Sequence, residues 1–165
     1  MRFIGIDPST KTGLVVLDES GNTVISREIT YKGEDPKRMY YIIEKTVNEV
    51  KLHASKEKVS VCIEGFGFNS RQATLLGGIG WGLRLAMFRF GIEYTEVPPA
   101  QVKRFACGRG NASKEYVSIG VYKRWGFEST SNNITDAYVL AQIARAQTGK
   151  LPLTKFQKEV IARIS

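Results

Sequence analysis

Short apolar runs separated by turn residues open the chain. The first run ends at Asp7, because Pro8 cannot donate a hydrogen bond within a sheet. Residues 13–18 form a second run, and residues 23–31 alternate enough to form a third strand. Residues 19–22, Glu-Ser-Gly-Asn, favour a hairpin turn between them. The opening pattern therefore predicts three strands in antiparallel sequence.

The rest of the chain alternates between helical periodicity and two further apolar runs. Glycine is common just after the last residue of a helix, so Gly91 and Gly126 are expected to end helices. Ser113 is expected to be the N-terminal cap of the helix that follows it. Short runs at 59–64 and 93–97 predict two more strands. Apolar residues spaced three or four apart predict helices over residues 36–54, 69–90, 99–105, 114–125, 132–144 and 154–164. Asn133 is expected to cap the fifth of these helices, with Asp136 three residues on as in a capping box.

Four glycines interrupt the apolar pattern of residues 69–90. Each glycine costs a helix about 1 kcal/mol relative to alanine, so close packing should offset that cost. Packing on the sheet is the simpler expectation, and packing on a second subunit is the alternative. The glycines are Gly77, Gly78, Gly80 and Gly82.

Length and composition suit one domain with a hydrophobic core. The chain has 165 residues, of which 42% are hydrophobic. Cys62 and Cys107 share no metal-type spacing and are expected to be free thiols, and His53, the only histidine, is given no chemistry. No apolar run approaches 18 residues, and the start lacks the charged and apolar regions of a signal peptide. These features favour a cytosolic protein, in a bacterial cell or a phage-infected host.

Three acidic residues stand where a site is expected. Asp7 and Glu64 each end a predicted strand, and Asp136 stands near the start of a late helix. If the two strands are neighbours, their carboxylates face one another and repel unless a proton or a cation lies between them. An Asp before proline is also a common turn residue, so a purely structural role stays open for Asp7.

The positive charge is unevenly distributed. The formal net charge is +8; residues 1–58 hold 10 Lys and Arg against 9 Asp and Glu, whereas residues 71–165 hold 14 against 6. A basic second half favours a polyanionic partner, most plainly nucleic acid, with a merely soluble basic surface as the alternative. The loop at residues 108–114, which contains Arg109 and Lys114, suits a phosphate at a helix start, or is an ordinary solvated loop.

These residue types limit the chemistry. The sequence has no Ser-His-Asp set, Cys-His pair or Cys/His metal cluster, whereas carboxylates alone suit hard cations such as Mg²⁺ or Mn²⁺. Beside a basic surface, carboxylate-bound metal suggests phosphodiester hydrolysis. Lys and Arg would then hold the DNA backbone while Phe66 or Phe68 stacks on an unpaired base.

The order of these elements resembles the ribonuclease H-like fold, and more closely the RuvC-type Holliday junction resolvases. The likeness rests on an ordered set of short segments at residues 5–9, 63–66, 70–90, 97–103, 110–114 and 136–141. It implies an α/β fold with a five-stranded mixed sheet, three antiparallel strands and then parallel ones, flanked by helices. It also implies a homodimer that makes symmetric nicks in a four-way junction.

The resemblance assigns roles to individual residues. Asp7, Glu64 and Asp136 match the acids that bind Mg²⁺, with Mn²⁺ as a substitute, and Lys103 and Lys114 match basic residues near the scissile phosphate. Lys114 joins the three acids in the catalytic set. The residues expected to contact DNA are Phe66, Phe68, Arg71, Lys103, Arg104, Arg109 and Lys114.

Two departures from the family pattern stand out. Asn133 takes the place of a second acid on the late helix; it can ligate metal through its carbonyl oxygen but adds no charge. Gly67 stands where a base-wedging aromatic is expected, between Phe66 and Phe68.

Three alternatives stay open at this stage. One is a nuclease of the same fold that processes structured RNA or flaps. Another is a non-catalytic junction-binding protein, in which Asn133 marks a decayed site. The third is a sugar kinase-like ATP-binding domain, but this chain is short for the two lobes that such chemistry needs.

Overall fold

The five strands form one mixed sheet in the order β3-β2-β1-β4-β5. The structure is a computed structural model that describes residues 1–67, 73–149 and 151–164. The strands are β1 (Arg2–Asp7), β2 (Thr12–Leu17), β3 (Thr23–Ile29), β4 (Val59–Glu64) and β5 (Thr95–Val97). The helices are α1 (Lys37–Ala54), α2 (Ala73–Arg89), α3 (Pro99–Cys107), α4 (Lys114–Trp125), α5 (Asn132–Ala146) and α6 (Lys155–Ile164).

The pairing of the strands confirms the predicted fold class. β2 pairs antiparallel with both β1 and β3, while β4 lies parallel to β1 and to β5. Two strands are shorter than expected, since β3 ends at Ile29 and β5 begins only at Thr95. The predicted helix over 69–90 begins at Ala73 in the described part, and residues 69–72 lie outside it.

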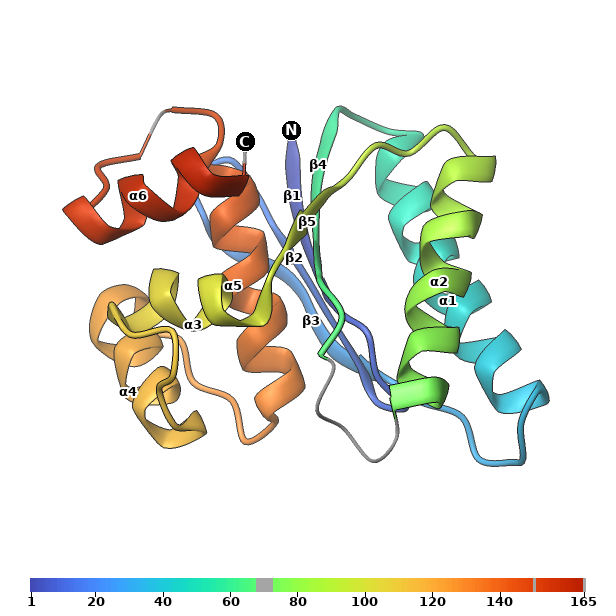
Figure 1. The fold of residues 1–165 in the computed structure, drawn as a ribbon. Coiled ribbons are helices and arrows are strands. Elements are labelled where there is room, and N and C mark those ends of the chain that lie inside the picture. The colour runs from blue at the N-terminus through green and yellow to red at the C-terminus, as the bar shows by residue number, and fades with distance from the viewer. Residues whose placement is uncertain (68–72, 150, 165) are drawn as a thin grey trace.

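Helices cover both faces of the sheet (Figure 1). Along β1, Ile4 and Ile6 face α1 and α2, whereas Phe3 belongs to the core on the opposite face, with α3 to α6. This alternation follows from the two-residue period of a strand, and it creates two hydrophobic cores separated by the sheet. Among the described residues, no helix is both long enough and apolar enough to span a membrane.

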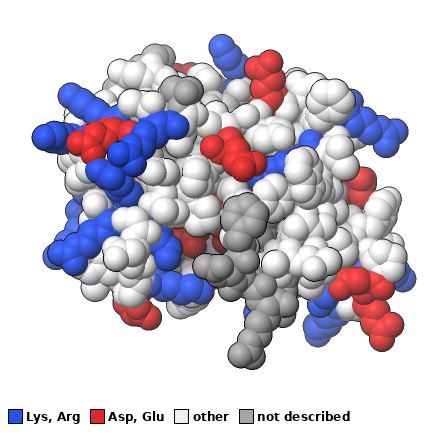
Figure 2. Space-filling model, in the orientation of Figure 1, with Lys and Arg blue, Asp and Glu red and all other residues white. Residues whose placement is uncertain are grey.

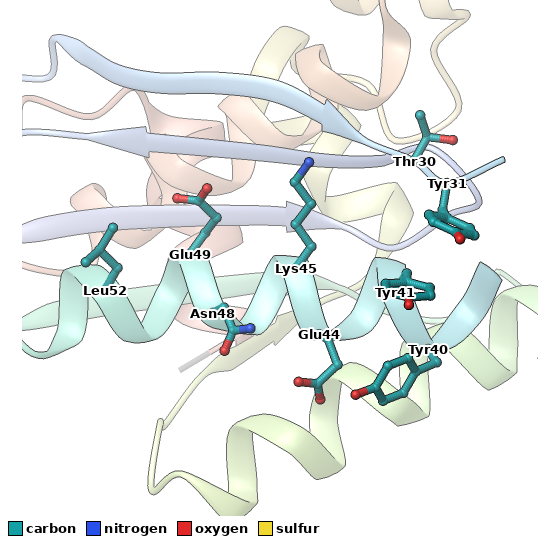
Figure 3. Close-up of a pocket in the computed structure, with 9 residues that line it drawn as sticks. All are labelled: Thr30, Tyr31, Tyr40, Tyr41, Glu44, Lys45, Asn48, Glu49 and Leu52. Carbon is teal, nitrogen blue, oxygen red and sulfur yellow. The ribbon is translucent and has the colours of Figure 1, made fainter. Parts of the chain in front are cut away.

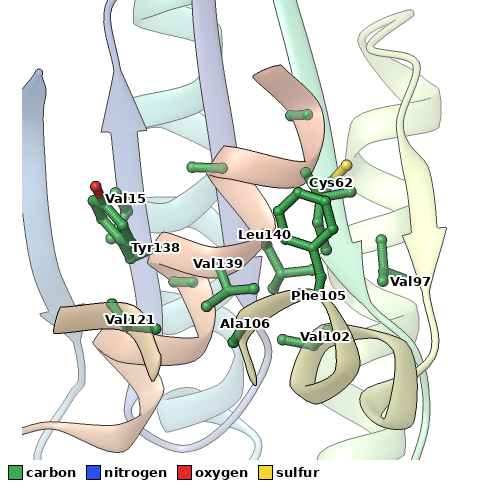
Figure 4. Packing of buried hydrophobic residues seen from close by; sticks show 14 of the residues in the cluster. Val15, Cys62, Val97, Val102, Phe105, Ala106, Val121, Tyr138, Val139 and Leu140 are labelled. Atoms are coloured by element: carbon green, nitrogen blue, oxygen red, sulfur yellow. The ribbon is translucent and has the colours of Figure 1, made fainter. Parts of the chain in front are cut away.

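The core around α5 packs tightly against β1, β4 and the helices α3 and α4 (Figure 4). Phe105 and Leu140 are almost completely buried, and the ring of Phe127 stacks on that of Tyr138 with centroids 3.9 Å apart. Cys62 is fully buried here as a free thiol, and burial raises its pKa to about 12. The expectation that Cys62 carries a free thiol is confirmed.

Two glycines allow α5 to lie directly on the sheet. A Cβ at Gly5 of β1 would stand 1.9 Å from the carbonyl oxygen of Ala137, and one at Gly13 of β2 would stand 2.1 Å from that of Asn133. No side chain fits at either position, so backbone meets backbone. This close contact sets the position of the first turns of α5 over the ends of β1 and β2.

The glycines of α2 have a different role from the expected one. A Cβ at Gly78 would meet the Met39 side chain at 2.4 Å, and one at Gly82 would meet Ile43 at 2.3 Å. Both contacts are with α1, so packing on the sheet was the wrong expectation for these two positions. The sheet side of α2 carries larger residues instead, including Ile79 and Leu83.

Candidate active site

Asp7 and Glu64 end the two central parallel strands side by side. The register pairs Ile6 with Ile63, so the next residue of each strand is an acid. The alternation of side chains turns both acids toward the face that α5 covers. Asp7 is 7% exposed, and its carboxyl group is hydrogen-bonded to that of Glu64.

Asp136 reaches this pair from α5. It is the fifth residue of that helix, one residue before Ala137, whose carbonyl group packs on Gly5. Its charge acts on both Asp7 and Glu64. The structure therefore brings together the three acids that stand 57 and 72 residues apart in the sequence.

Burial is the largest influence on the pKa values of these three acids. Burial, followed by the charge of Asp136, raises the pKa of Asp7 from 3.8 to about 7. Burial and the two neighbouring acids also raise the pKa of Glu64 well above its ordinary value. Burial raises the pKa of Asp136 to about 6, although the charges of Lys114 and Lys103 oppose that shift. Such a group favours a proton or a cation at its centre.

Two lysines approach the acids from the neighbouring helices. Lys103 projects from α3 and acts on Glu64 and Asp136, and Lys114 begins α4 and acts on Asp7 and Asp136. Ser113 caps α4 as predicted, since its hydroxyl oxygen accepts from the backbone N–H of Tyr116. The cap fixes the start of the helix, and thereby the backbone from which Lys114 projects.

The donor set fits a hard divalent cation by its chemistry. In the described part of the chain, no group of three or more His, Cys, Asp or Glu side chains is arranged so that it could hold a metal ion as it stands, and Asp7 and Glu64 share a hydrogen bond instead. A hydrogen bond between two carboxyl groups requires a proton, which a cation can replace. The oxygen-only donors exclude the softer, thiolate-binding metals.

Asn133 does not cap α5, and this corrects the capping-box expectation. Ser131 is the cap, because its Oγ accepts from the backbone N–H of Ile134 at 3.2 Å. The Asn133 amide nitrogen donates to the carbonyl oxygen of Lys11 at 2.9 Å and to the Glu28 carboxylate at 3.4 Å. Asn133 thus ties the first turn of α5 to the turn after β1 and to β3.

Phe66 is anchored rather than extended. Its half-buried ring stacks on that of Trp81, with centroids 5.5 Å apart, and lies 4.3 Å from the guanidinium of Arg84. The other aromatic candidate, Phe68, and the basic candidate Arg71 lie outside the described residues.

The remaining basic candidates lie in different settings. Arg109 is exposed beyond α3 and stands 5.2 Å from the ring of Tyr116. Arg104 instead forms an ion pair with Glu159 of α6, on another side of α3 from Lys103. Lys and Arg side chains gather on the left of the molecule, over α3, α4 and α6 (Figure 2).

A hollow of about 730 Å³ lies between the end of β3 and α1, away from the three acids (Figure 3). Tyr31 and Tyr41 stack in its wall at 4.4 Å, beside Tyr40. Glu44 and Lys45 bring opposite charges to it, so it offers no excess of positive charge for a phosphate.

Two residues at the site escaped the sequence reasoning. Glu28 accepts hydrogen bonds from Ser131 and Asn133, and Arg84 holds the loop after β4. Glu28 stands on an alternating edge strand, where charge is ordinary. For Arg84, the one signal available in the sequence was that this charged residue stands at a position where the helical pattern predicts a core residue.

Comparisons with known proteins identify the family to which this chain is similar. The family model described as crossover junction endodeoxyribonuclease RuvC matches residues 3–144. The RuvC of Moorella thermoacetica is 30% identical over 99% of this chain and 100% of its own length, and that of Chloroherpeton thalassium is 25% identical over 96% and 89%.

Solved structures show the same fold. Thermus thermophilus RuvC superposes with a TM-score of 0.69 at 25% identity, over 93% of this chain and 100% of the other. The same protein in complex with a Holliday junction substrate gives 0.70 at 24% identity, over 93% and 99%. The match of the family model over most of the chain and the full-length relatives lead to one conclusion: this chain belongs to the RuvC family of crossover junction endodeoxyribonucleases.

Proposed function

We propose that this protein is a divalent-metal-dependent endonuclease that binds four-way DNA junctions and resolves them by symmetric phosphodiester hydrolysis. The observation that carries the proposal is the group of Asp7, which is buried, with the half-buried Glu64 and Asp136, flanked by Lys103 and Lys114. The four-way junction is proposed as the substrate because the chain belongs to the RuvC family, whose members are named crossover junction endodeoxyribonucleases.

The acids are the proposed metal ligands. Asp7, Glu64 and Asp136 would bind Mg²⁺, with Mn²⁺ as a substitute, and Asn133 would add its carbonyl oxygen, since its amide nitrogen is bound elsewhere. When bound, the metal supplies an activated water and stabilises the leaving oxygen. The protein contributes a set of neighbouring carboxylates whose charges repel a phosphate until metal neutralises them.

The lysines position the phosphate. Lys114, exposed at the first residue of α4, would neutralise charge on the scissile phosphate as part of the catalytic set, and Lys103 would hold the strand beside it. Arg109 extends this basic path, and Phe66, Phe68 and Arg71 remain proposed contacts near the branch point. We leave Arg104 out, because Glu159 already holds its guanidinium.

The outer side of α2 supports a homodimer. Trp81, Leu85 and Phe88 lie four and three residues apart on one helix face, and Phe88 is 82% exposed. A junction resolved by two symmetric nicks needs two copies of the acid group related by a twofold axis. We therefore propose that this apolar face packs on the same face of a second copy.

We also propose that residues 1–165 act as one nuclease domain, because one sheet supports both hydrophobic cores and the acid group. The protein would act in the cytoplasm of a bacterium, where its DNA substrate lies; the relatives named above are all bacterial.

The test is cleavage of an immobile four-way DNA junction, with the matching linear duplex and a flap as controls, in Mg²⁺ and then in Mn²⁺. Paired symmetric nicks in the junction alone are expected. Cutting of every branched form would indicate a general debranching nuclease, and tight junction binding without nicks in either metal would favour the binding-only alternative.

A further inference from the structure

Arg84 is a charged residue in the hydrophobic interior of the protein. It lies on α2 among Ile79, Leu83 and Met87, and its side chain is only 3% exposed. A buried guanidinium persists only where acceptors satisfy its N–H groups. What those acceptors are therefore shows what the residue does.

The guanidinium of Arg84 joins three separate elements. Its Nε and Nη2 atoms donate to Glu96 Oε2 of β5 at 2.9 and 2.6 Å, and Nη1 donates to the Gly80 carbonyl oxygen at 3.0 Å. Nη2 also donates to the backbone carbonyl oxygen of Glu64 at 3.1 Å. The planar fork of arginine suits this divergent set, which a single ammonium group cannot reproduce.

The peptide of Glu64 is thereby held on both sides. Arg84 binds its carbonyl oxygen, and the next backbone N–H, that of Gly65, donates to the carbonyl oxygen of Val97 at 2.8 Å. Glu64 is the last residue of β4, where a strand would otherwise fray. These two bonds extend the rigid part of the backbone just past the carboxylate that faces Asp7.

The same guanidinium supports the loop that follows. The centre of the Phe66 ring lies 4.3 Å from the guanidinium of Arg84, and the ring stacks on that of Trp81. A Cβ at Gly80 would stand 2.7 Å from Phe66 and 3.2 Å from Arg84 Nη1, so glycine at this position makes room for both. Arg84, Phe66 and Trp81 thus connect the exposed face of α2 to the backbone of Glu64.

We propose that Arg84 is a positioning residue that fixes Glu64 through its backbone carbonyl group and couples it to Phe66. This inference rests on the proposed nuclease function for its effect on cleavage. Arg84 contacts no substrate; its role is to hold the carboxylate of Glu64 in register with those of Asp7 and Asp136. A displacement of about 1 Å in a catalytic group can lower a rate roughly a hundredfold, so loosening this contact should be costly.

The test compares Arg84→Lys with Arg89→Lys, an exposed arginine on the same helix. Arg84→Lys keeps the charge, but its chain is one atom shorter than the path to Nη2, and it lacks the separate Nε and Nη1 donors that fix the guanidinium. Single-turnover cleavage of a saturating junction is expected to slow about tenfold or more, while metal-free junction affinity stays within about twofold. Arg89→Lys is expected to leave both unchanged.

A second readout does not depend on cleavage. Hydrogen exchange of the peptide that contains Gly65 should be faster in Arg84→Lys than in the wild type, while exchange within β1 stays the same. If the wild type does not cut junctions, this measurement still tests the contact. Unchanged Gly65 exchange would overturn the proposal, and so would a normal cleavage rate in a folded Arg84→Lys protein.

A second variant covers the case in which Arg84→Lys does not fold. Glu96→Gln removes the charge that orients the guanidinium and leaves the buried arginine in place. Like Arg84→Lys, it is expected to speed hydrogen exchange at Gly65 and to slow cleavage. A cleavage loss that merely follows the melting temperature, and disappears on cooling, would mean that Arg84 serves stability alone.

Discussion

At the scale of single residues, the protein carries three carboxyl groups whose surroundings disfavour the ionised form. Burial is the largest cause of the raised pKa of Asp7, of Glu64 and of Asp136, and the charge of Asp136 raises the pKa values of Asp7 and Glu64 further. A folded state with raised carboxyl pKa values binds more protons than the unfolded chain. Its stability is therefore complete at low pH and declines as the acids ionise.

The metal-free protein should accordingly lose stability from about pH 4, the ordinary pKa of Asp7, to about pH 7, its pKa in the fold. Full ionisation of Asp7 alone would cost on the order of 4 kcal/mol. Asp7→Asn should melt several degrees higher than the wild type at pH 8, since 1 kcal/mol corresponds to about 2 to 4 °C at this size, and by much less at pH 5. Thermal melts in a chelator check this. Equal midpoints of the two proteins at pH 8 would contradict the electrostatic account.

Lys114 should contribute one ionic contact to DNA. Lys114→Ala is expected to weaken junction binding and to reduce the slope of log affinity against log salt concentration by about one ion. Lys45→Ala, an exposed lysine of α1 on the opposite face of the sheet, is the control and should leave the slope unchanged. Binding titrations at several salt concentrations make the comparison; an unaltered slope in Lys114→Ala would remove this residue from the DNA surface.

At the scale of elements, the site depends on how closely α5 approaches the sheet. Gly5 and Gly13 admit the backbone of α5, and Ser131, Asn133 and Glu28 fasten its first turn. The acid of α5 reaches the two strand acids only because this helix has no side-chain layer beneath its first turns.

Gly5→Ala tests that contact. Its Cβ would stand 1.9 Å from a backbone oxygen, so the helix must move, and we expect a loss of about 3 kcal/mol or more of unfolding free energy. Gly77→Ala is the matched control: its Cβ would meet nothing within 4 Å, and alanine should stabilise α2 by up to about 1 kcal/mol. Chemical denaturation measures both, and equal effects would show that α5 does not rest on Gly5.

The sequence predicted the elements well because their signals are local. Strand ends at Asp7 and Glu64, the Ser113 cap and the Gly126 stop all depend on neighbours in the chain. The N-cap at Ser131 was missed because Asn133 and Asp136 imitate a capping box, and only the contacts with Lys11 and Glu28 show how Asn133 is used. The ion pair of Arg104 with Glu159, 55 residues away, had no local signal at all.

At the scale of the whole molecule, the sheet separates two tasks. The acid group and the basic helices α3 and α4 lie on one face of the sheet, whereas α2 lies on the other (Figure 1), where it exposes the apolar face of Trp81, Leu85 and Phe88. Arg84 and Phe66 connect the two at the end of β4. A second copy bound at α2 would thus stand near the loop beside Glu64.

The dimer proposal has a direct test. Phe88→Glu places a charge on this apolar face at its most exposed residue and should shift the protein from dimer to monomer, as measured by sedimentation or light scattering. Tyr40→Glu is the control, since this α1 aromatic is also exposed, at 58%, and should leave the mass unchanged. A wild type that is monomeric at micromolar concentration would refute the proposal at once.

The central claim is that Asp7, Glu64 and Asp136 form one metal-dependent cleavage site. The most direct measurement is cleavage and binding of a four-way junction by the wild type, Asp7→Asn, Glu64→Gln and Asp136→Asn, side by side in Mg²⁺. The account predicts that each single variant loses cleavage by orders of magnitude while binding the junction as tightly as the wild type or more tightly, because a repelling charge has been removed. Retained cleavage in any one of the three, or lost binding in a folded variant, would contradict it.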